Sequence, residues 1–485
     1  MQLMQLMKRI LLSFMSQNWR KFTLKQRSRK RFLSAFFALI FAIAFAFTLV
    51  LHSFLPSFIF NDQADQAIAQ TSPQSQRKQS QSNSQRNQSP RNQQSKQSPS
   101  SSPKNAQLLP QPLIPPLPPV NPTIVNKKQE IRGVWLTSND FTMFSDRKQL
   151  SEALQQLKQL NFNTIYPVVW NGGYVMYPSS VAQREGIQPF VYRGSEGQDI
   201  VADIIAQAHQ HDLLVMPWFE FGFMAPPTSE LALTHPNWLT QERNGDTTSI
   251  TAAGEVAWLN PFHPEVQKFL TELVLEAVTN YDLDGIQFDD HTSLPKTFGY
   301  DRYTLSLYKQ ETKKDAPADV DDPAWVRWRA NKLTAFMANL NKAVKQRKPN
   351  VIFSVSPNYY EFAYKQQLQD WLGWVRQNIV DELIVQVYRN DLDDFRSQVS
   401  RAEIVEVQNK ISTGIGILSG LRNSNVPMSR VYSQVITAQE RGLGISFFYY
   451  KSLWGYGPES VSDRQKDLKY LFRSPAPRLF ARGSF

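Results

Sequence analysis

From Glu130 onward, short apolar runs alternate with segments of helical periodicity, and this alternation limits the possible fold more than any other feature. Eight runs of six to eight residues have the composition of buried strands. Strands that alternate with helices build parallel sheets covered by helices. The sequence therefore predicts an α/β fold, a (β/α)8 TIM barrel, whose strands are residues 132–137, 164–170, 213–220, 284–290, 351–357, 382–388, 411–418 and 444–450.

Helical patterns fill the intervals between these runs. Two intervals carry apolar residues at helical spacing around Leu154 and Ile204. Two others begin with Pro264 and Pro323, which suit the first turn of a helix. A doubly wound open sheet is the alternative architecture, but the sequence has no glycine-rich phosphate loop to accompany it.

Charge is spread unevenly along the 485 residues, which carry a formal net charge of +11. Residues 1–32 hold nine Lys or Arg and no acid, and residues 61–128 hold eight basic and two acidic residues. Residues 129–485 therefore hold 36 basic and 40 acidic residues. The positive charge belongs to the N-terminal part, so no nucleic-acid partner is expected.

Residues 1–60 are expected to hold a basic cytoplasmic segment and a membrane-spanning or signal helix. The uncharged run from Leu33 to Leu51 is long enough to cross a bilayer. Basic residues directly before it place the N-terminus in the cytoplasm. The sequence from Ala67 to Ala69 is typical of a signal-peptidase site, but the apolar run is longer than in most signal peptides. Cleavage is left open.

Residues 61–129 are expected to be a disordered linker, because Gln, Ser, Asn and Pro dominate and offer no core. The linker would join the membrane helix to a barrel formed by residues 130–485. The chain has no cysteine, so disulfides and thiolate metal sites are excluded.

The fourth strand, in the sequence LDGIQFDDH (residues 283–291), ends in two adjacent carboxylates. If Ile286 and Phe288 pack outward, alternation turns Asp289 into the barrel. Barrel enzymes hold their catalytic groups just past the C-terminal ends of the strands. Asp289 is therefore the first catalytic candidate, with Asp290 beside it. The alternative is that these residues only form the turn.

Further polar and aromatic residues follow the other strands. Glu220, after the third strand, would face Asp289 as the second carboxyl group of a glycosidase; a structural ion pair with Arg389 is the alternative. Sugar rings stack on aromatic side chains, and their hydroxyls bind polar ones. The candidates for substrate binding are Trp170, Asn171, Trp218, His291, Asn358, Tyr359, Gln386, Tyr388, Arg389, Tyr450 and Trp454.

Other acidic and histidine residues give weaker signals. Asp381 and Glu382 precede the sixth strand, at the opposite end of the barrel, and are expected to be structural. None of the six histidines forms an HExxH pair. No metal or cofactor is predicted, although a cation bound by Asp289 and Asp290 is left open.

Residues 130 to 450 resemble the glycosyl-hydrolase-like 10 family of bacterial envelope proteins. The matching motifs are IRGVWLT, LNFNTIYPVVWNGGY, PWFEFGFMAP, HPNWLT, WLNPFHPEV, YDLDGIQFDDH and VDELIVQVYRND. The resemblance implies a TIM-barrel hydrolase of extracytoplasmic glycans, with its acids at Glu220, Asp289 and Asp290. The chain has Gln287 and His291 where chitinases have an acid, which puts a chitinase-like mechanism in doubt.

The resulting hypothesis is a membrane-tethered or exported glycoside hydrolase. Its partner would be a cell-wall glycan, either peptidoglycan strands or a related amino-sugar polymer, cleaved by carboxylate acid/base catalysis. One alternative is a catalytically weak glycan-binding anchor. Another is a metal-dependent deacetylase that uses the Asp pair.

The first prediction concerns topology. A reporter enzyme that works only outside the cytoplasm, fused after Phe485, should be active, because the basic block before Leu33 keeps the N-terminus inside. A matched fusion to a reporter that works only in the cytoplasm should be silent. The opposite pattern of activities would contradict the predicted topology.

Overall fold

The computed structural model describes residues 130–190, 197–251, 254–476 and 478. No helix within these ranges is long and apolar enough to cross a membrane. The predicted membrane helix and the predicted linker lie outside the described residues, so both stay predictions.

Nine β-segments form one parallel sheet, in the order β5-β2-β1-β14-β13-β12-β11-β10-β6. All eight predicted strands are present among them. The segments are β1 (Arg132–Leu136), β2 (Thr164–Pro167), β5 (Leu214–Val215), β6 (Trp218–Phe219), β10 (Gly285–Asp289), β11 (Ile352–Ser356), β12 (Glu382–Gln386), β13 (Ser412–Leu418) and β14 (Gly444–Phe448).

The two ends of this sheet meet in a single predicted strand. β5 and β6 stand at opposite ends of the order, yet only Met216 and Pro217 separate them. The N–H of Met216 donates to Ile165 on one side (3.0 Å), and the carbonyl of Pro217 accepts from Gln287 on the other (2.9 Å). The proline has no N–H to leave unpaired at the break. The sheet therefore curls into a (β/α) barrel.

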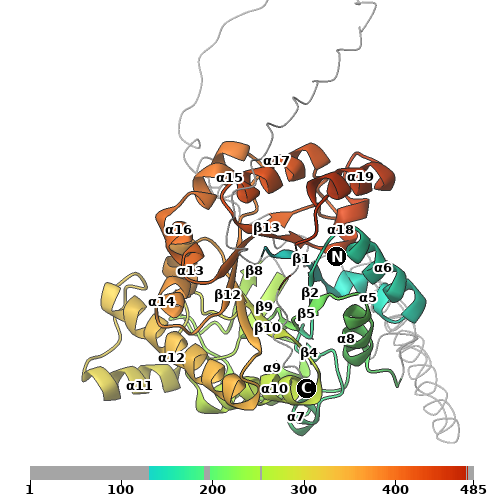
Figure 1. The fold of residues 1–485 in the computed structure, drawn as a ribbon. Helices are drawn as coiled ribbons and strands as arrows, with labels where there is room; N and C mark the ends of the chain where they lie inside the picture. The colour runs from blue at the N-terminus through green and yellow to red at the C-terminus, as the bar shows by residue number, and fades with distance from the viewer. Residues whose placement is uncertain (1–129, 191–196, 252–253, 477, 479–485) are drawn as a thin grey trace, which may run out of the picture. The chain divides into compact units, whose positions relative to one another are not determined.

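The helices surround the strands as an outer ring (Figure 1). The four predicted helices are observed as α6, α8, α10 and α12. Asp146 and Asp322 accept backbone N–H groups in the first turns of α6 and α12, which stabilises both starts. The ring comprises α5 (Phe141–Phe144), α6 (Arg147–Gln159), α8 (Ile200–Gln210), α10 (Pro264–Asn280), α12 (Pro323–Arg347), α13 (Tyr360–Gln367), α14 (Trp371–Arg376), α15 (Leu392–Val399), α16 (Ala402–Gln408), α17 (Met428–Gln439), α18 (Tyr450–Gly455) and α19 (Val461–Leu471).

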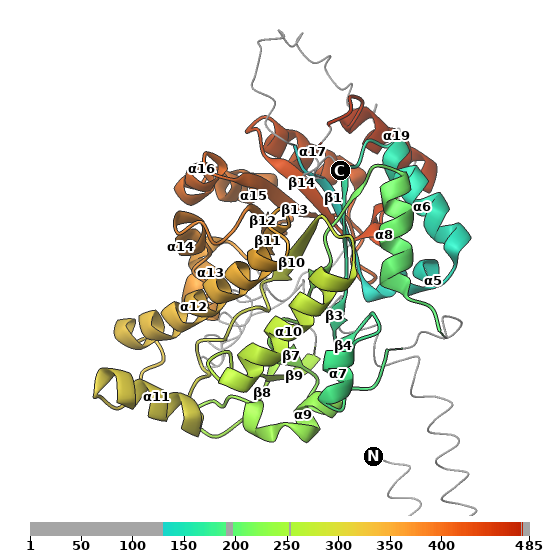
Figure 2. The ribbon, with the colours of Figure 1, turned by 60° about the horizontal axis from the view of Figure 1, so that its bottom comes forward.

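Long insertions follow the second, third and fourth strands, and they extend the C-terminal end of the barrel (Figure 2). This end is where (β/α) barrels hold their active sites. The inserted elements are β3 (Trp170–Asn171), β4 (Tyr174–Val175), α7 (Ser180–Arg184), β7 (Met224–Ala225), α9 (Glu230–Thr234), η2 (Pro236–Trp238), β8 (Thr248–Thr251), β9 (Gly254–Trp258) and α11 (Arg302–Thr312). A short helix, η1 (Ser138–Asp140), follows β1.

Side chains of β10 alternate between the barrel interior and the outer layer. Gln287 lies inside, where it accepts from the indole N–H of Trp135 (2.6 Å) and donates to the hydroxyl of Ser354 (3.0 Å). Phe288 lies outside, against Phe219 at 5.6 Å between ring centroids. This alternation agrees with the prediction and turns the next residue, Asp289, toward the interior.

A buried ion pair lies at the N-terminal end of the barrel. Glu382, at the start of β12, is fully buried and pairs with Arg478 of the C-terminal segment. Tyr166 and Ser354 also donate to Glu382 (2.9 Å each), and Thr164 accepts from Arg478 (2.9 Å). Glu382 is thus a structural residue, as expected, but its partner was not foreseen.

Removing Arg478 should destabilise the barrel strongly. The Arg478→Ala variant leaves Glu382 in the core without its counter-charge, which typically costs about 3 kcal/mol or more in the free energy of unfolding. Urea denaturation would measure the loss. Arg473→Ala is the matched control, because Arg473 lies at the surface over the ring of Tyr470. Equal denaturation midpoints for the two variants would contradict the prediction.

Candidate active site

The Asp289 carboxyl group is held by donors from two strands. Asp289 ends β10 and is only 4% exposed. Its Oδ1 accepts from the backbone N–H of Asp290 (2.5 Å) and from the side-chain amide of Gln386 (2.8 Å). Gln386 ends β12 and also donates to the carbonyl of Ser356 (2.8 Å). Both donors bind the same oxygen, so neither of them occupies Oδ2.

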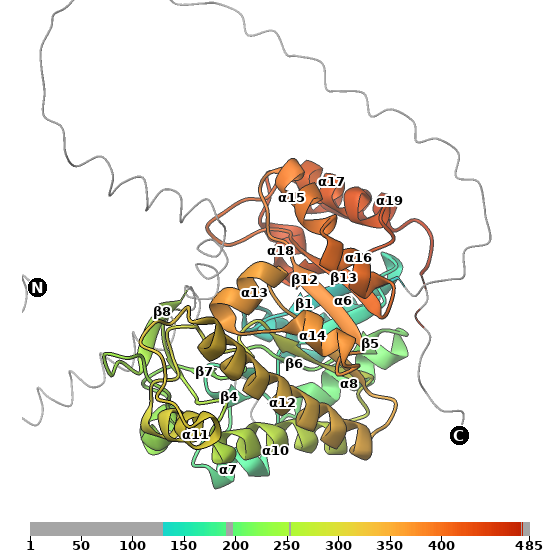
Figure 3. The same cartoon turned by 90° about the vertical axis from the view of Figure 1, so that its left-hand side faces the viewer.

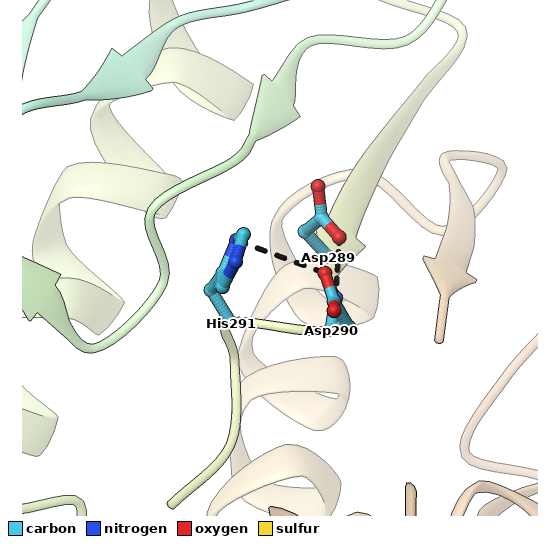
Figure 4. A group of neighbouring side chains, drawn as sticks. All are labelled: Asp289, Asp290 and His291. Atoms are coloured by element: carbon cyan, nitrogen blue, oxygen red, sulfur yellow. Dashed lines mark hydrogen bonds and ion pairs between the residues drawn. The ribbon is translucent and has the colours of Figure 1, made fainter. Parts of the chain in front are cut away.

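Asp290 lies between Asp289 and His291 (Figure 4). Its Oδ2 accepts from the amide of Asn358 (2.6 Å). Gln386 lies 3.5 Å and the Nδ1 of His291 lies 3.7 Å from its Oδ1. Asp289 and Gln367 also hydrogen-bond to this carboxyl group, so several neighbours hold it in place.

Glu220 joins the site from the end of the third strand. The side-chain amide of Asn171 donates to its carboxyl group in a short hydrogen bond. The backbone carbonyl of Glu220 lies 3.2 Å from the Nδ1 of His291. The alternative pairing with Arg389 is wrong, because that guanidinium lies over the ring of Tyr359 instead.

Glu220 keeps its proton at neutral pH. Burial raises the pKa of this carboxyl group to about 8. The hydrogen bond from Asn171 lowers the pKa in part, and the charge of Asp290 raises it further. A carboxylic acid with this pKa can donate a proton near pH 7.

Asp289 and Asp290 have opposite pKa shifts. Burial, followed by the charge of Asp290, raises the pKa of Asp289 well above its usual value. Burial also acts to raise the pKa of Asp290, but the charge of His291 and hydrogen bonds from Asp289 and two glutamine side chains together lower it. The pair therefore shares one proton, with Asp289 as the acid and Asp290 as the carboxylate.

The Asp pair and His291 could together hold a metal ion. One ligand atom from each of Asp289, Asp290 and His291 lies within 4.8 Å of the others, which is close enough for a shared ion. The amides of Asn358 and Gln386 donate to Oδ2 of Asp290 and Oδ1 of Asp289, so these two donors bind only one oxygen of each carboxyl group. The contacts of the pair are therefore compatible with a shared ion as well as with a shared proton.

An aromatic cluster lies in the barrel interior beneath the acids. The ring of Trp218 lies 6.3 Å from Trp135 and 6.4 Å from Phe448, and Tyr388 lies 5.9 Å from Phe448. Burial and the charge of Asp289 raise the pKa of Tyr388, which places its hydroxyl near the acids. Trp218 and Tyr388 were predicted as sugar-binding residues, but the side chain of Trp218 is buried in this cluster and is not open to a sugar. Trp135 and Phe448 were missed, although strand alternation could have found them.

A third missed residue is Gln369, which lies between α13 and α14. Its amide donates to the backbone carbonyls of Asp289 (3.0 Å) and Thr292 (3.2 Å), so it holds the loop that carries the acids. No sequence signal indicates this contact, because Gln369 lies outside every predicted strand.

Trp170 is a core residue and not a sugar-binding one. It is fully buried, its indole N–H donates to the carbonyl of Gly222 (3.0 Å), and its ring packs 5.9 Å from Phe269. The reason is that β2 ends at Pro167 and the chain turns into the β3–β4 hairpin. Trp170 begins this hairpin and packs against α10.

Tyr450 and Trp454 are also misassigned to the cleft around Asp289. The hydroxyl of Tyr450 lies 3.4 Å from Gln156 of α6, so this side chain points to the outer ring of helices. Trp454 packs against Tyr450, at 5.8 Å between centroids. Both residues belong to α18, which turns away from the barrel axis after β14.

The fold and the three acids at its strand ends define a (β/α)-barrel glycoside hydrolase. The chain belongs to the glycosyl hydrolase-like 10 family, whose sequence model matches residues 130–437. This finding confirms the resemblance noted from the sequence and the prediction of a glycoside hydrolase.

Two relatives and two solved structures illustrate the match. Glycosyl hydrolase DigH of Escherichia coli is 25% identical over 308 residues, which cover 55% of this chain and 67% of DigH. Glycosyl hydrolase YngK of Bacillus subtilis is 22% identical and covers 54% of each chain. The PgaB glycoside hydrolase domain from Bordetella bronchiseptica superimposes with a TM-score of 0.53, at 13% identity, over 71% of this chain and 98% of that domain. An α-L-fucosidase from Paenibacillus thiaminolyticus gives 0.50, at 14% identity, over 71% and 49%. These structures support the fold alone.

Glu220 should make the stability of the protein depend on pH. Its folded-state pKa of about 8 exceeds its ordinary value of 4.5, so its contribution to stability is full below pH 4.5 and is lost as the pH rises to about 8. The Glu220→Gln variant should therefore lose less stability than the wild type between these limits, by up to about 1.4 kcal/mol per pH unit.

Thermal unfolding at several pH values would measure this difference. Glu152→Gln, at an exposed site, is the matched control and should follow the wild type. Parallel profiles for the wild type and Glu220→Gln would show that Glu220 is ionised when folded.

Proposed function

We propose that this protein hydrolyses a glycan of the bacterial cell envelope, either peptidoglycan strands or a related amino-sugar polymer. The observation that carries the proposal is the grouping of Glu220, Asp289 and Asp290 at the ends of neighbouring strands. Burial raises the pKa of Glu220 to about 8 and the pKa of Asp289 well above its usual value, whereas neighbouring groups lower the pKa of Asp290. Glycoside hydrolysis needs this combination, because one group protonates the leaving oxygen and an ionised group acts as nucleophile or base.

The proposed roles follow from the protonation states. The pKa values of Glu220 and Asp289 are both raised, so both carboxyl groups suit the acid that protonates the glycosidic oxygen. The pKa of Asp290 is lowered, which suits stabilisation of positive charge on the sugar or activation of water. Where Asp290 stabilises the sugar, the conjugate base of the acid takes the proton of the attacking water; where Asp290 activates the water, Asp290 takes that proton itself.

The surroundings of the acids support a carbohydrate substrate. Amide side chains from three strand ends approach the carboxyl groups, and the half-buried ring of Tyr388 lies near them. Amides bind sugar hydroxyls, and aromatic rings stack on their apolar faces. The predicted N-terminal helix and linker support an envelope glycan as the polymer.

We also propose that the barrel, residues 130–485, lies outside the cytoplasm. It is either anchored to the outer side of the cytoplasmic membrane or secreted to the periplasm. The supporting observation is the basic block before the apolar run from Leu33 to Leu51. The pair of reporter fusions after Phe485 tests this location.

Substitution of the acids tests the proposed chemistry. Asp289→Asn removes an exchangeable proton without changing side-chain size, so turnover of wall glycan should fall at least about 100-fold. Glu220→Gln should cause a similar loss. Asp381→Asn is the control, because Asp381 pairs with Lys345 at the far end of the barrel and should alter mainly stability. Release of reducing ends from peptide-stripped wall glycan is the measurement.

The same variants separate the roles and the alternatives. The residue that protonates the leaving group should matter far less for aryl glycosides whose leaving group needs no proton. Near-normal hydrolysis by the Asp289→Asn variant would show that Asp289 is not the essential acid and would make Asp290 the candidate for that role. Glycan binding without any release by the wild type would indicate a binding anchor, and acetate release sensitive to chelators would indicate a metal-dependent deacetylase.

A further inference from the structure

A cavity of about 250 Å³ lies between η1 and α18, apart from the three acids. It has an aromatic wall, an aliphatic edge and several polar side chains. The residues that line it are Asn139, Asp140, Thr142, Met143, Tyr450, Lys451, Trp454, Gly455 and Val461.

The cavity belongs to the same end of the barrel as the acids but to the other side of it. η1 follows β1 and α18 follows β14, and these strands are neighbours in the sheet. Among the eight strand positions of the barrel, β14 and β10 lie opposite each other. Strands about 4.8 Å apart that tilt by about 36° form a barrel roughly 15 Å across, which is the separation of the two strands. Figures 1 and 3 show α18 beside β1 and α6. The cavity is therefore separate from the cleft at Asp289.

The polar groups of the cavity are available to a ligand. Among the described residues, the side chains of Asn139, Thr142 and Lys451 form no hydrogen bond or ion pair with the protein. Asp140 differs, because its carboxyl group accepts from the backbone N–H groups of Thr137 (2.8 Å) and Lys451 (3.2 Å). Asp140 thus holds the two walls together and attracts the charge of Lys451, while the side chains of Asn139 and Thr142 stay uncommitted.

This combination suits a sugar ring. Trp454 and Tyr450 form a wall on which the apolar face of a pyranose can stack, and an amide, a hydroxyl and an ammonium group can bind its hydroxyls. The volume is below that of most sites for larger ligands, so it limits the occupant to a small unit.

We propose that this cavity is a second sugar-binding subsite, which holds one unit of the glycan strand at a distance from the bond that is cleaved. The identity of the glycan rests on the proposed function. A strand that reaches both the acids and the cavity is bound at two linked places, so it gains affinity that a short fragment cannot gain. The cavity would thus make the enzyme prefer long strands.

Binding of glycan fragments of different length tests the subsite. The probe is peptide-free wall glycan, cut into soluble fragments and sorted into short and long classes. Affinities are measured by calorimetry on the full-length Glu220→Gln protein, so that the fragments stay intact. Adding Trp454→Ala should lower the ratio of long-fragment to short-fragment affinity about tenfold, the scale of one aromatic stacking contact. Asn139→Ala, a milder surface change, should lower the ratio in the same direction.

The control and the contrary outcomes are distinct. Tyr470→Ala removes a partly exposed aromatic ring that stacks on Tyr432 away from the cavity, and should leave the ratio unchanged. One contrary outcome is that the Trp454→Ala and Asn139→Ala variants both bind all fragments normally, with an unchanged ratio of long-fragment to short-fragment affinity. That outcome would overturn the subsite and leave the proposed function intact. Failure of the parent protein to bind any fragment would overturn the proposed function and the subsite with it.

Discussion

The site depends on how the third strand closes the barrel. β5 pairs with β2, and β6 pairs with β10 in a register that places Phe219 beside Phe288. The next residues along these two strands are Glu220 and Asp289. Closure of the sheet therefore brings two carboxyl groups from distant parts of the sequence to one strand end, and the rest of the site follows from their proximity.

Placing three acids together in a buried site is unfavourable, and the surrounding donors offset part of that cost. Asn171, Asn358 and Gln386 each give a side-chain N–H to one of the carboxyl groups, and each comes from a different strand end. The remaining cost appears as the raised pKa values of Glu220 and Asp289, because burial disfavours their charged forms. The same burial that weakens the fold at higher pH thus provides proton donors for catalysis.

The buried acids at the two ends of the barrel differ in their partners. At the N-terminal end, Glu382 and Arg478 neutralise each other inside the core, so this acid has a structural role. At the C-terminal end the three carboxyl groups have no lysine or arginine in an ion pair among the residues that the structure describes, and they lie on the side of the insertions after the second, third and fourth strands. This difference between paired and unpaired acids separates structural from catalytic candidates more clearly than burial does, since Glu382 and Asp289 are both buried.

Local patterns in the sequence determined the strands, the four clearest helices and the Asp pair at the end of β10, because hydrophobic alternation and helix caps act between residues close together in the chain. They also indicated Glu220, Asn358 and Gln386, since parallel strands end at one face. Only the tertiary structure decided that Trp170 packs in the core, that Tyr450 and Trp454 line a separate cavity, and that Gln369 supports the acidic loop. These outcomes depend on the direction in which each chain segment turns after its strand ends, and that direction is set by packing against residues far away in the sequence.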